Sequence, residues 1–530
     1  MKHSMLAGAV AAVSLALAVP AIAQAPSATP KRGGTLTFAI SAEAPTYDCH
    51  AGNTYAVVHA VAPFYSTLLK FDLSKYPAVE GDVAESWEIS PDQKTFTFRL
   101  RDNVVFHDGT RLTSRDVRAT YERLRNPPPG VVSVRRASYE DISEILTPDE
   151  RTVVFKLSEP NPSVFQNFAS PWDCIYSAAK LAEDPLFPQK TIMGTGPFKF
   201  VEHVRGSHFA GVRHEQYHVR GQPYLDGFRG VIFSQGSAML NALQGGQVLA
   251  EFRSLSPAER DRIVGTLGQR IRIEEESWVL KLTVAFNAEK APFNDPRVRR
   301  ALSMAIDRWG GSQGLSRIAT LRAVGGVMRP GSPFATPEAE LAKLPGFGRD
   351  IRAAREEARR LLREAGVPNL SFVLTNRTLA QPYTPGGVFL VDQWRQIGVT
   401  VEHRQLETAA YNAAQANGTF DVILDFSNEF MDEPNNGLTK YISSDRSPNN
   451  PARAVDRDLD RLYDQQRRET DPAKRNAIIQ EFERLAMERA YTVPLLWWHR
   501  IVATHQHLRG WQMSPSHLLG QSLAGVWLDQ

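Results

Sequence analysis

Amphipathic helices alternate with short apolar strands through the second half of this chain, and this order constrains the fold more than any other feature. Three helices are predicted to begin where an Asp can accept hydrogen bonds from free backbone amides, at Asp295, Asp350 and Asp471. Apolar residues follow each Asp at helical spacing. Strands are predicted between the helices, over residues 370–374, 399–402 and 420–424. Helices that alternate with strands are typical of an α/β lobe.

The first half contains the clearest strand pattern. Residues 95–100 read Thr-Phe-Thr-Phe-Arg-Leu, an alternation that gives a strand one buried and one exposed face. A second strand is predicted over residues 152–157. The helix between them is expected to begin near Thr113 and to end before the prolines at 127–129.

Length and charge limit the classes of protein that fit. A chain of 530 residues exceeds what one hydrophobic core supports, so two or three domains are expected. The 61 basic and 58 acidic side chains give a formal net charge of +3. This near balance argues against nucleic acid as a partner.

The first 23 residues have the order of a secretory signal, with Lys2 near the start, an apolar run over 5–19, and Ala21-Ile22-Ala23 at the cleavage position. The run is shorter than the roughly 20 residues that a membrane span needs, although an uncleaved anchor is the alternative. No Cys lies near the cleavage position, so no lipid anchor is expected. We therefore predict a signal peptide over 1–23 and a mature protein, beginning near Gln24, that is free in the periplasm.

The chain contains two cysteines, Cys49 and Cys174. An oxidising compartment permits a disulfide between them. The alternative is two separately buried thiols, because a free Cys packs as a small apolar side chain.

A long signature region covers residues 81–117, which read GDVAESWEISPDQKTFTFRLRDNVVFHDGTRLTSRDV. This stretch resembles the signature of the family 5 extracellular solute-binding proteins, the peptide/opine/nickel class of bacterial ABC importers. Further segments match that family in its order, at 194–198 (GTGPF), 292–302 (PFNDPRVRRAL), 361–366 (LLREAG) and 420–422 (FDV). The resemblance covers essentially the whole mature chain.

The resemblance implies an α/β fold, a two-lobed clamshell of the class II periplasmic binding protein type with an additional small domain on the first lobe. Lobe I is expected over 31–62, 192–280 and 499–530, the extra domain over 63–191, and lobe II over 281–498. The chain crosses between the lobes near Leu280 and near Trp497. A ligand binds between the lobes, which close around it by a hinge motion, and the closed form docks on a membrane permease.

The loop after Phe420 bears most directly on the ligand. In many peptide-binding relatives an Asp of this loop pairs with the amino terminus of the peptide, and a Trp packs beside it. Here Ser427 stands at the Trp position and Phe430 at the Asp position, with Glu429 next to it. A buried ammonium group needs a countercharge. The peptide hypothesis is therefore weakened but stays open.

One arginine and several aromatic residues are further candidate contacts. Arg377 follows the strand 370–374, where the family often faces the cleft, and its guanidinium can hold a carboxylate through two hydrogen bonds. A surface position is the alternative for Arg377, and core packing is the alternative for the aromatic residues. The predicted ligand-binding residues are Tyr47, Cys49, Trp172, Asn376, Arg377, Phe426, Ser427, Asn428, Glu429, Phe430 and Trp498.

No motif points to catalysis or to a metal site. His107 and Asp108 belong to a predicted turn and lack an accompanying nucleophile. The histidines at 203, 208, 214 and 218 do not have the spacing of a helical metal motif. We therefore expect no catalytic residue, no metal ligand and no cofactor, and we interpret the chain as a binding protein and not an enzyme.

The predicted function is that of a monomeric substrate-binding component of an ABC importer. It would capture a short peptide or another nitrogen-containing or carboxylated metabolite and deliver it to the permease. A carrier of metal chelates, as in the nickel-type relatives, is the first alternative. A periplasmic chaperone or sensor with the same fold is the second.

Overall fold

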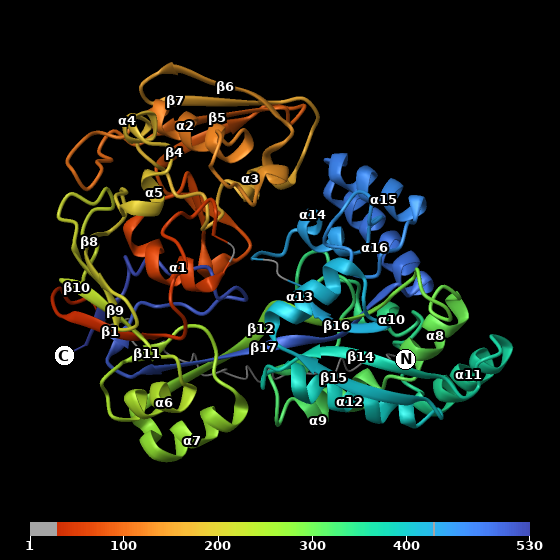
Figure 1. Ribbon diagram of the computed structural model, residues 1–530. Coiled ribbons are helices and arrows are strands. Elements are labelled where there is room, and N and C mark those ends of the chain that lie inside the picture. Colours follow the sequence, from red (N-terminus) through yellow and green to blue (C-terminus); the bar gives the residue numbers. More distant parts are fainter. Residues whose placement is uncertain (1–28, 53, 428–429, 530) are drawn as a thin grey trace, which may run out of the picture.

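Two bodies of mixed helix and strand are joined by two long strands (Figure 1). The structure is a computed structural model that describes residues 29–52, 54–427 and 430–529. The joining strands, β12 (Ile271–Phe286) and β17 (Thr492–His505), pair antiparallel. They make the strands of both lobes part of one 11-stranded sheet, in the order β15-β14-β16-β12-β17-β11-β1-β10-β9-β8, with β13 on β17.

The pairing of β12 with β17 is irregular where the chain passes between the lobes. Ser277 pairs with His499 and Lys281 with Trp497, and the register shifts between these two pairs. An extra residue on one strand bends and twists it locally. The lobe boundaries that the resemblance implies, near Leu280 and near Trp497, stay a prediction.

In lobe II the predicted strands are confirmed as β14 (Ser371–Arg377), β15 (Thr400–Leu406) and β16 (Val422–Phe426). The three predicted helix starts are also confirmed. Asp295, Asp350 and Asp471 accept hydrogen bonds from backbone amides at the first turns of α8 (Pro296–Met304), α11 (Ile351–Glu364) and α16 (Pro472–Arg489). The remaining elements are α9 (Arg308–Leu315), β13 (Leu321–Ala323), α10 (Glu338–Leu341), α12 (Tyr383–Arg395), α13 (Thr408–Asn417), α14 (Pro434–Gly437) and α15 (Arg457–Arg468).

Lobe I has its own core on the other half of the sheet, where Phe38 packs against Phe228 and Phe252. The C-terminal segment returns here, because the amide of Val279 donates a hydrogen bond to the carbonyl of Pro515. The strands are β1 (Thr35–Ile40), β8 (Phe198–Val204), β9 (His208–Arg213), β10 (Gly227–Ile232), β11 (Ala250–Glu251), β18 (Leu508–Arg509) and β19 (Trp527–Leu528). The helices are α1 (Tyr55–Val61), α6 (Gly236–Gln244) and α7 (Pro257–Leu267).

The extra domain has a separate four-stranded antiparallel sheet, β4 (Ala84–Ile89), β5 (Thr95–Leu100), β7 (Thr152–Leu157) and β6 (Ile142–Asp149), in that order. The two strands predicted in this half are therefore confirmed as β5 and β7. The helix between them, α2 (Ser114–Arg125), begins with a capping box of Thr113 and Asp116. The short elements are β2 (Leu69–Phe71), β3 (Val79–Gly81), α3 (Ser163–Asn167), α4 (Ala178–Glu183) and α5 (Phe187–Lys190).

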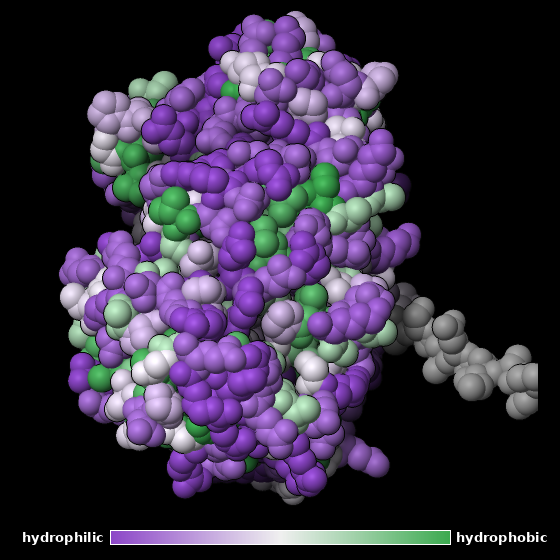
Figure 2. Space-filling view, turned by 90° about the vertical axis from the view of Figure 1, so that its right-hand side faces the viewer, coloured by the Kyte–Doolittle hydropathy of each residue, from purple (hydrophilic) through white to green (hydrophobic). Residues whose placement is uncertain are grey.

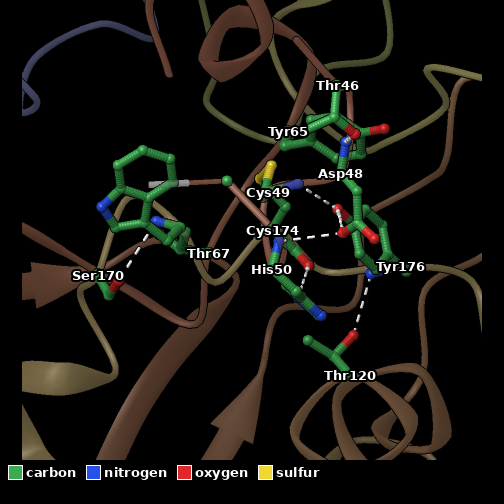
Figure 3. Close-up of a disulfide and its surroundings, with 12 residues drawn as sticks. Thr46, Asp48, Cys49, His50, Tyr65, Thr67, Thr120, Ser170, Cys174 and Tyr176 are labelled. Carbon is green, nitrogen blue, oxygen red and sulfur yellow. Dashed lines mark hydrogen bonds between the residues drawn. A yellow bond between two sulfur atoms is a disulfide. The ribbon is translucent and has the colours of Figure 1, made fainter. Parts of the chain in front are cut away.

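A disulfide between Cys49 and Cys174 connects lobe I to the extra domain (Figure 3). Asp48, next to the disulfide, forms a buried ion pair with Arg123 of α2, with 2.6 Å between Oδ2 and Nη2. The hydroxyl of Tyr176 accepts a hydrogen bond from the amide of Cys49 at 2.9 Å. The extra domain is thus held on lobe I by a covalent bond and a buried polar network. Of the two alternatives predicted for the cysteines, a disulfide or two buried thiols, the structure contains the disulfide.

The surface at the lobe II end is mostly hydrophilic, with small apolar groups scattered between polar side chains (Figure 2). Single exposed apolar residues of this kind are usual for a protein surface. Within the described ranges, no helix is both long and apolar enough to span a membrane.

Candidate functional site

A cavity of about 910 Å³ lies between the extra domain and lobe II. Its wall on the extra-domain side is formed by Val134, Arg135, Ala137 and Ser138. Its wall on the lobe II side includes Arg377 at the end of β14, Phe426 at the end of β16, and Phe430. Because the two walls come from opposite sides of the hinge, closing the lobes would enclose anything bound here.

Another cavity, of about 370 Å³, is lined by lobe I and the extra domain alone, with Lys70 and Trp511 among its residues. The disulfide and the Asp48–Arg123 pair fix these two parts to each other. Motion of lobe II would not close this second cavity, so it does not have the geometry of a clamshell site.

Most charged side chains of the larger cavity are paired. The Asp425 carboxylate accepts from Lys440 Nζ at 2.5 Å and from the Tyr411 hydroxyl at 3.2 Å. Arg453 lies 2.5 Å from the Glu289 carboxylate, and Asp445 lies 2.5 Å from Arg457. These groups are therefore not the ones that attract a ligand of opposite charge.

Arg377 is an exception. Its guanidinium lies over the rings of Tyr411, Phe426 and Tyr383, at 4.5, 4.9 and 5.4 Å from their centroids. Its one side-chain hydrogen bond to a described residue is a long contact of 3.4 Å from Nη2 to Asn412 Oδ1. No carboxylate in the described part of the chain forms an ion pair with it. The site therefore offers a positively charged fork held in place by aromatic faces.

Arg135 faces the same cavity from the extra domain. Its guanidinium lies 4.1 Å from the centroid of the Trp172 ring, and Nη1 donates to the carbonyl of Gly52 at 2.8 Å. Burial lowers the pKa of Arg135 to about 10. No ion pair to this arginine occurs among the residues with a described position. Sequence reasoning missed Arg135, because nothing in its local pattern shows that residues 134–138 face lobe II.

The described residues among the predicted ligand-binding residues fall into three groups. Arg377, Phe426 and Phe430 line the cavity. Two others support its lining: Trp172 lies under Arg135, and Trp498 stacks on Phe426 with 6.4 Å between ring centroids. Trp172 and Trp498 are themselves buried.

Four others lie away from the cavity and have structural partners. The Tyr47 hydroxyl bonds to His203 Nδ1 at 2.6 Å within lobe I. The buried Asn376 side chain donates to the carbonyl of Tyr383 at 2.8 Å, and the buried Ser427 hydroxyl accepts from the amide of Lys281 at 3.1 Å. Cys49 is buried in the disulfide. These four side chains are held by the partners named here and are not among the lining residues of the cavity, so their contact with a ligand stays a prediction. Asn428 and Glu429 lie outside the described residues.

Polar contacts join the extra domain to lobe II beside the cavity. Glu433 pairs with Arg475 of α16 at 2.6 Å and accepts from the Ser163 hydroxyl of α3. The amide of Asp432 donates to the Tyr76 hydroxyl at 2.9 Å. Arg467 of α15 lies 2.8 Å from the carboxylate of Asp141. The segment after Phe430 thus contacts both sides of the boundary.

The model of the bacterial extracellular solute-binding proteins, family 5 (middle), matches residues 78–449. The chain belongs to this family. It is a family of solute-binding proteins and not of enzymes, and the two-lobed α/β fold expected from the resemblance is confirmed by the solved structures of similar fold.

Three relatives show how far the similarity extends. A protein of Brucella ovis, whose name assigns it to the peptide-binding proteins of ABC transporters, is 30% identical over 371 residues, which are 68% of this chain and 66% of the relative. The di/tripeptide-binding protein 2 of Pseudomonas aeruginosa is 26% identical over 89% of this family 5 chain and 88% of its own length. The structure of the PBP AgaA in complex with agropinic acid, from A. tumefaciens R10, has a TM-score of 0.77 at 26% identity and covers 94% of this chain and 99% of that one.

Proposed function

We propose that this family 5 protein is the periplasmic substrate-binding component of an ABC importer, which captures a small organic solute between its lobes and delivers it to a membrane permease. The observation that carries the proposal is the cavity between the extra domain and lobe II, with Arg377 facing it and lacking an acidic partner in the described chain. The names of the relatives, which refer to peptides, di- and tripeptides and agropinic acid, support a small organic ligand.

The solute is proposed to carry a carboxylate that Arg377 binds. A guanidinium and a carboxylate match in a two-hydrogen-bond geometry, and such charge-assisted bonds are among the strongest in proteins. Phe426 and Phe430 line the cavity near this point and supply apolar surface for the rest of the solute. Short peptides, other nitrogen-containing acids and carboxylated chelators of metals all contain the required group.

The role is proposed to end at binding. The one cavity carboxylate on β16, Asp425, is held by Lys440 and Tyr411 and is not placed as a free base. Within the described ranges, no group of His, Cys, Asp and Glu residues has the arrangement of a metal site. A metal-chelate carrier, the alternative function, would therefore have to recognise the chelator and not the bare ion.

Export is part of the proposal and rests on the sequence alone. The apolar run over 5–19 and the Ala21-Ile22-Ala23 site predict cleavage before Gln24 and release into the periplasm. N-terminal sequencing of the protein recovered from the periplasm should find Gln24 at or near the start. A mature product that still begins at Met1 would contradict the proposed export route.

A thermal-shift screen tests the function. The purified protein is heated with a panel of di- and tripeptides, amino-acid derivatives, aromatic and aliphatic carboxylic acids, and metal chelates. A compound that binds only the native state raises the melting temperature. At least one carboxylated compound should do so for the parent and not for Arg377→Gln. Stabilisation by amines or neutral compounds alone, or equal stabilisation of the variant, would contradict the proposal.

A further inference from the structure

We propose that the solute is a dianion with two separate carboxylates, one bound by Arg377 of lobe II and the other by Arg135 of the extra domain. The inference rests on the proposed function and specifies its substrate class. It assigns a ligand-binding role to Arg135 and makes the two arginines the two ends of one site.

The balance of charges in the cavity leads to this assignment. Among the described residues, six charged ones line it: Arg135, Arg377, Asp425, Lys440, Asp445 and Arg453. Four of these form ion pairs at 2.5 Å. Asp425 and Lys440 pair with each other, Arg453 pairs with Glu289, and Asp445 pairs with Arg457. The two that remain are both cations, and each lies on a different wall. In the described part of the chain, the cavity is therefore short of negative charge on both sides.

Both arginines are also held in fixed positions. A guanidinium has five N–H donors. Nη1 of Arg135 donates to the Gly52 carbonyl, and its guanidinium lies 4.1 Å from the centroid of the Trp172 ring. Among the described residues, the side chain of Arg377 makes only the long hydrogen bond to Asn412, and it packs against Phe426 and Tyr411. Aromatic packing restricts the side chains without neutralising them, so most of their donors stay available to an anion.

Desolvation explains why a dianion suits this cavity better than a zwitterion. Burial lowers the pKa of Arg135 although the nearby Asp173 raises it, so Asp173, which forms no ion pair with this arginine, compensates its charge only in part. A second carboxylate on the solute supplies further compensation when the lobes close. An ammonium group in the same place would add a third positive charge beside Arg135 and Arg377, at a cost that rises as water is excluded.

The apolar part of the cavity indicates what joins the two carboxylates. Phe426 and Phe430 line the cavity together with Arg377. An aliphatic or aromatic linker between the carboxylates would bury apolar surface against these rings. The class is therefore an organic dicarboxylate with an apolar or planar middle.

Calorimetric titration separates this inference from the proposed function. The probes are a series of straight-chain and aromatic dicarboxylic acids, and for the tightest of them the corresponding monoamide, which keeps the shape and loses one charge. The parent should bind the dicarboxylate roughly 10- to 100-fold more tightly than the monoamide, the range expected for a charge-assisted hydrogen bond. In Arg135→Gln this difference should fall to within about twofold, because the partner of the second carboxylate is gone.

Three controls make the result decisive. Arg484→Gln changes an arginine of α16 that lies outside the cavity and pairs with Glu481 and Glu488, and should leave affinity unchanged. Arg135→Lys keeps the charge and should retain part of the preference, whereas a purely structural role would make the Lys and Gln variants alike. Melting temperatures without ligand check that each variant is folded.

The possible failures differ. If Arg377→Gln abolishes binding while Arg135→Gln binds dicarboxylate and monoamide as the parent does, the dianion inference is wrong and the proposed function stands. If no carboxylic acid binds the parent at all, both are wrong.

Discussion

Arg475 of α16 and Glu433 form a buried ion pair beside the cavity, with 2.6 Å between Nη2 and Oε1 and exposures of 6% and 2%. Ser163 of the extra domain donates to the same carboxylate, so the pair also contributes to the contact between the extra domain and lobe II. Glu433 follows Phe430 by three residues, which places this contact next to a residue that lines the cavity. We therefore expect the segment 430–433 to take part both in ligand binding, through Phe430, and in the contact between the lobes, through Glu433.

Loss of one partner of this pair should destabilise the protein strongly. Arg475→Met leaves a buried, uncompensated Glu433, and we expect the free energy of unfolding to fall by about 3–5 kcal/mol. Urea denaturation measures the change. The control is Arg484→Met, since the Arg484–Glu481 pair is nearly half exposed, with 45% and 47% of the side chains accessible, and should lose at most about 1 kcal/mol. Equal losses in the two variants would contradict the importance of the buried pair.

Removal of the disulfide should lower stability by a comparable amount. Cys49 and Cys174 are 125 residues apart, and a cross-link over a loop of this length restricts the unfolded chain considerably. We expect the double variant Cys49→Ala/Cys174→Ala to lose about 2–5 kcal/mol, measured by thermal or chemical unfolding. A reducing agent should lower the melting temperature of the parent and leave that of the double variant unchanged. The same response in both proteins would mean that the disulfide does not form.

Buried histidines should make the protein sensitive to acid. Burial lowers the pKa of His59 to about 3, below its value of about 6.5 in an unfolded chain. The unfolded state therefore binds more protons between these two pH values. The contribution of the neutral His59 to the free energy of unfolding is fully present above about pH 6.5 and is lost as the pH falls towards 3. His59→Gln should reduce the slope of unfolding free energy against pH by up to about 1.4 kcal/mol per pH unit.

An unchanged slope in His59→Gln would show that His59 becomes protonated in the folded protein.

Phe430 tests whether the aromatic residues of the cavity bind ligand or maintain the fold. It lines the cavity and also packs against the cores of lobe I and the extra domain. Phe430→Ala should weaken binding of the best compound from the screen while the melting temperature without ligand changes little. Phe168→Ala, in the core of the extra domain, should instead cost about 3–5 kcal/mol. If Phe430→Ala melts as early as Phe168→Ala and its folded fraction binds normally, Phe430 is a core residue.

Local features of the fold could be predicted from the sequence. The strand Thr95–Leu100 alternates apolar and polar side chains, and Asp295, Asp350 and Asp471 cap helices through bonds to neighbouring amides. These depend on residues within one or two turns. Family resemblance added the arrangement of the lobes, which no local pattern contains.

The cavity could be predicted only in part, because it depends on contacts between distant segments. Asn376 and Arg377 are adjacent on β14, and successive side chains of a strand point to opposite faces. The structure buries Asn376 against Tyr383 and directs Arg377 to the cavity. A sequence pattern gives the alternation but not which face meets the cleft. Arg135 lies more than 200 positions away from Arg377, and only the folded extra domain brings it to the same cavity.

Small-angle X-ray scattering tests most directly the claim that this protein closes around a carboxylated solute. The radius of gyration is measured with and without a saturating amount of the carboxylic acid that gives the largest thermal shift, for the parent and for Arg377→Gln. Ligand can favour closure only by binding the closed form better than the open form. The parent should become more compact on addition of the acid, and Arg377→Gln should not change. A parent that binds the acid by calorimetry with no change in its radius of gyration, and with the scattering of an open form, would contradict the account.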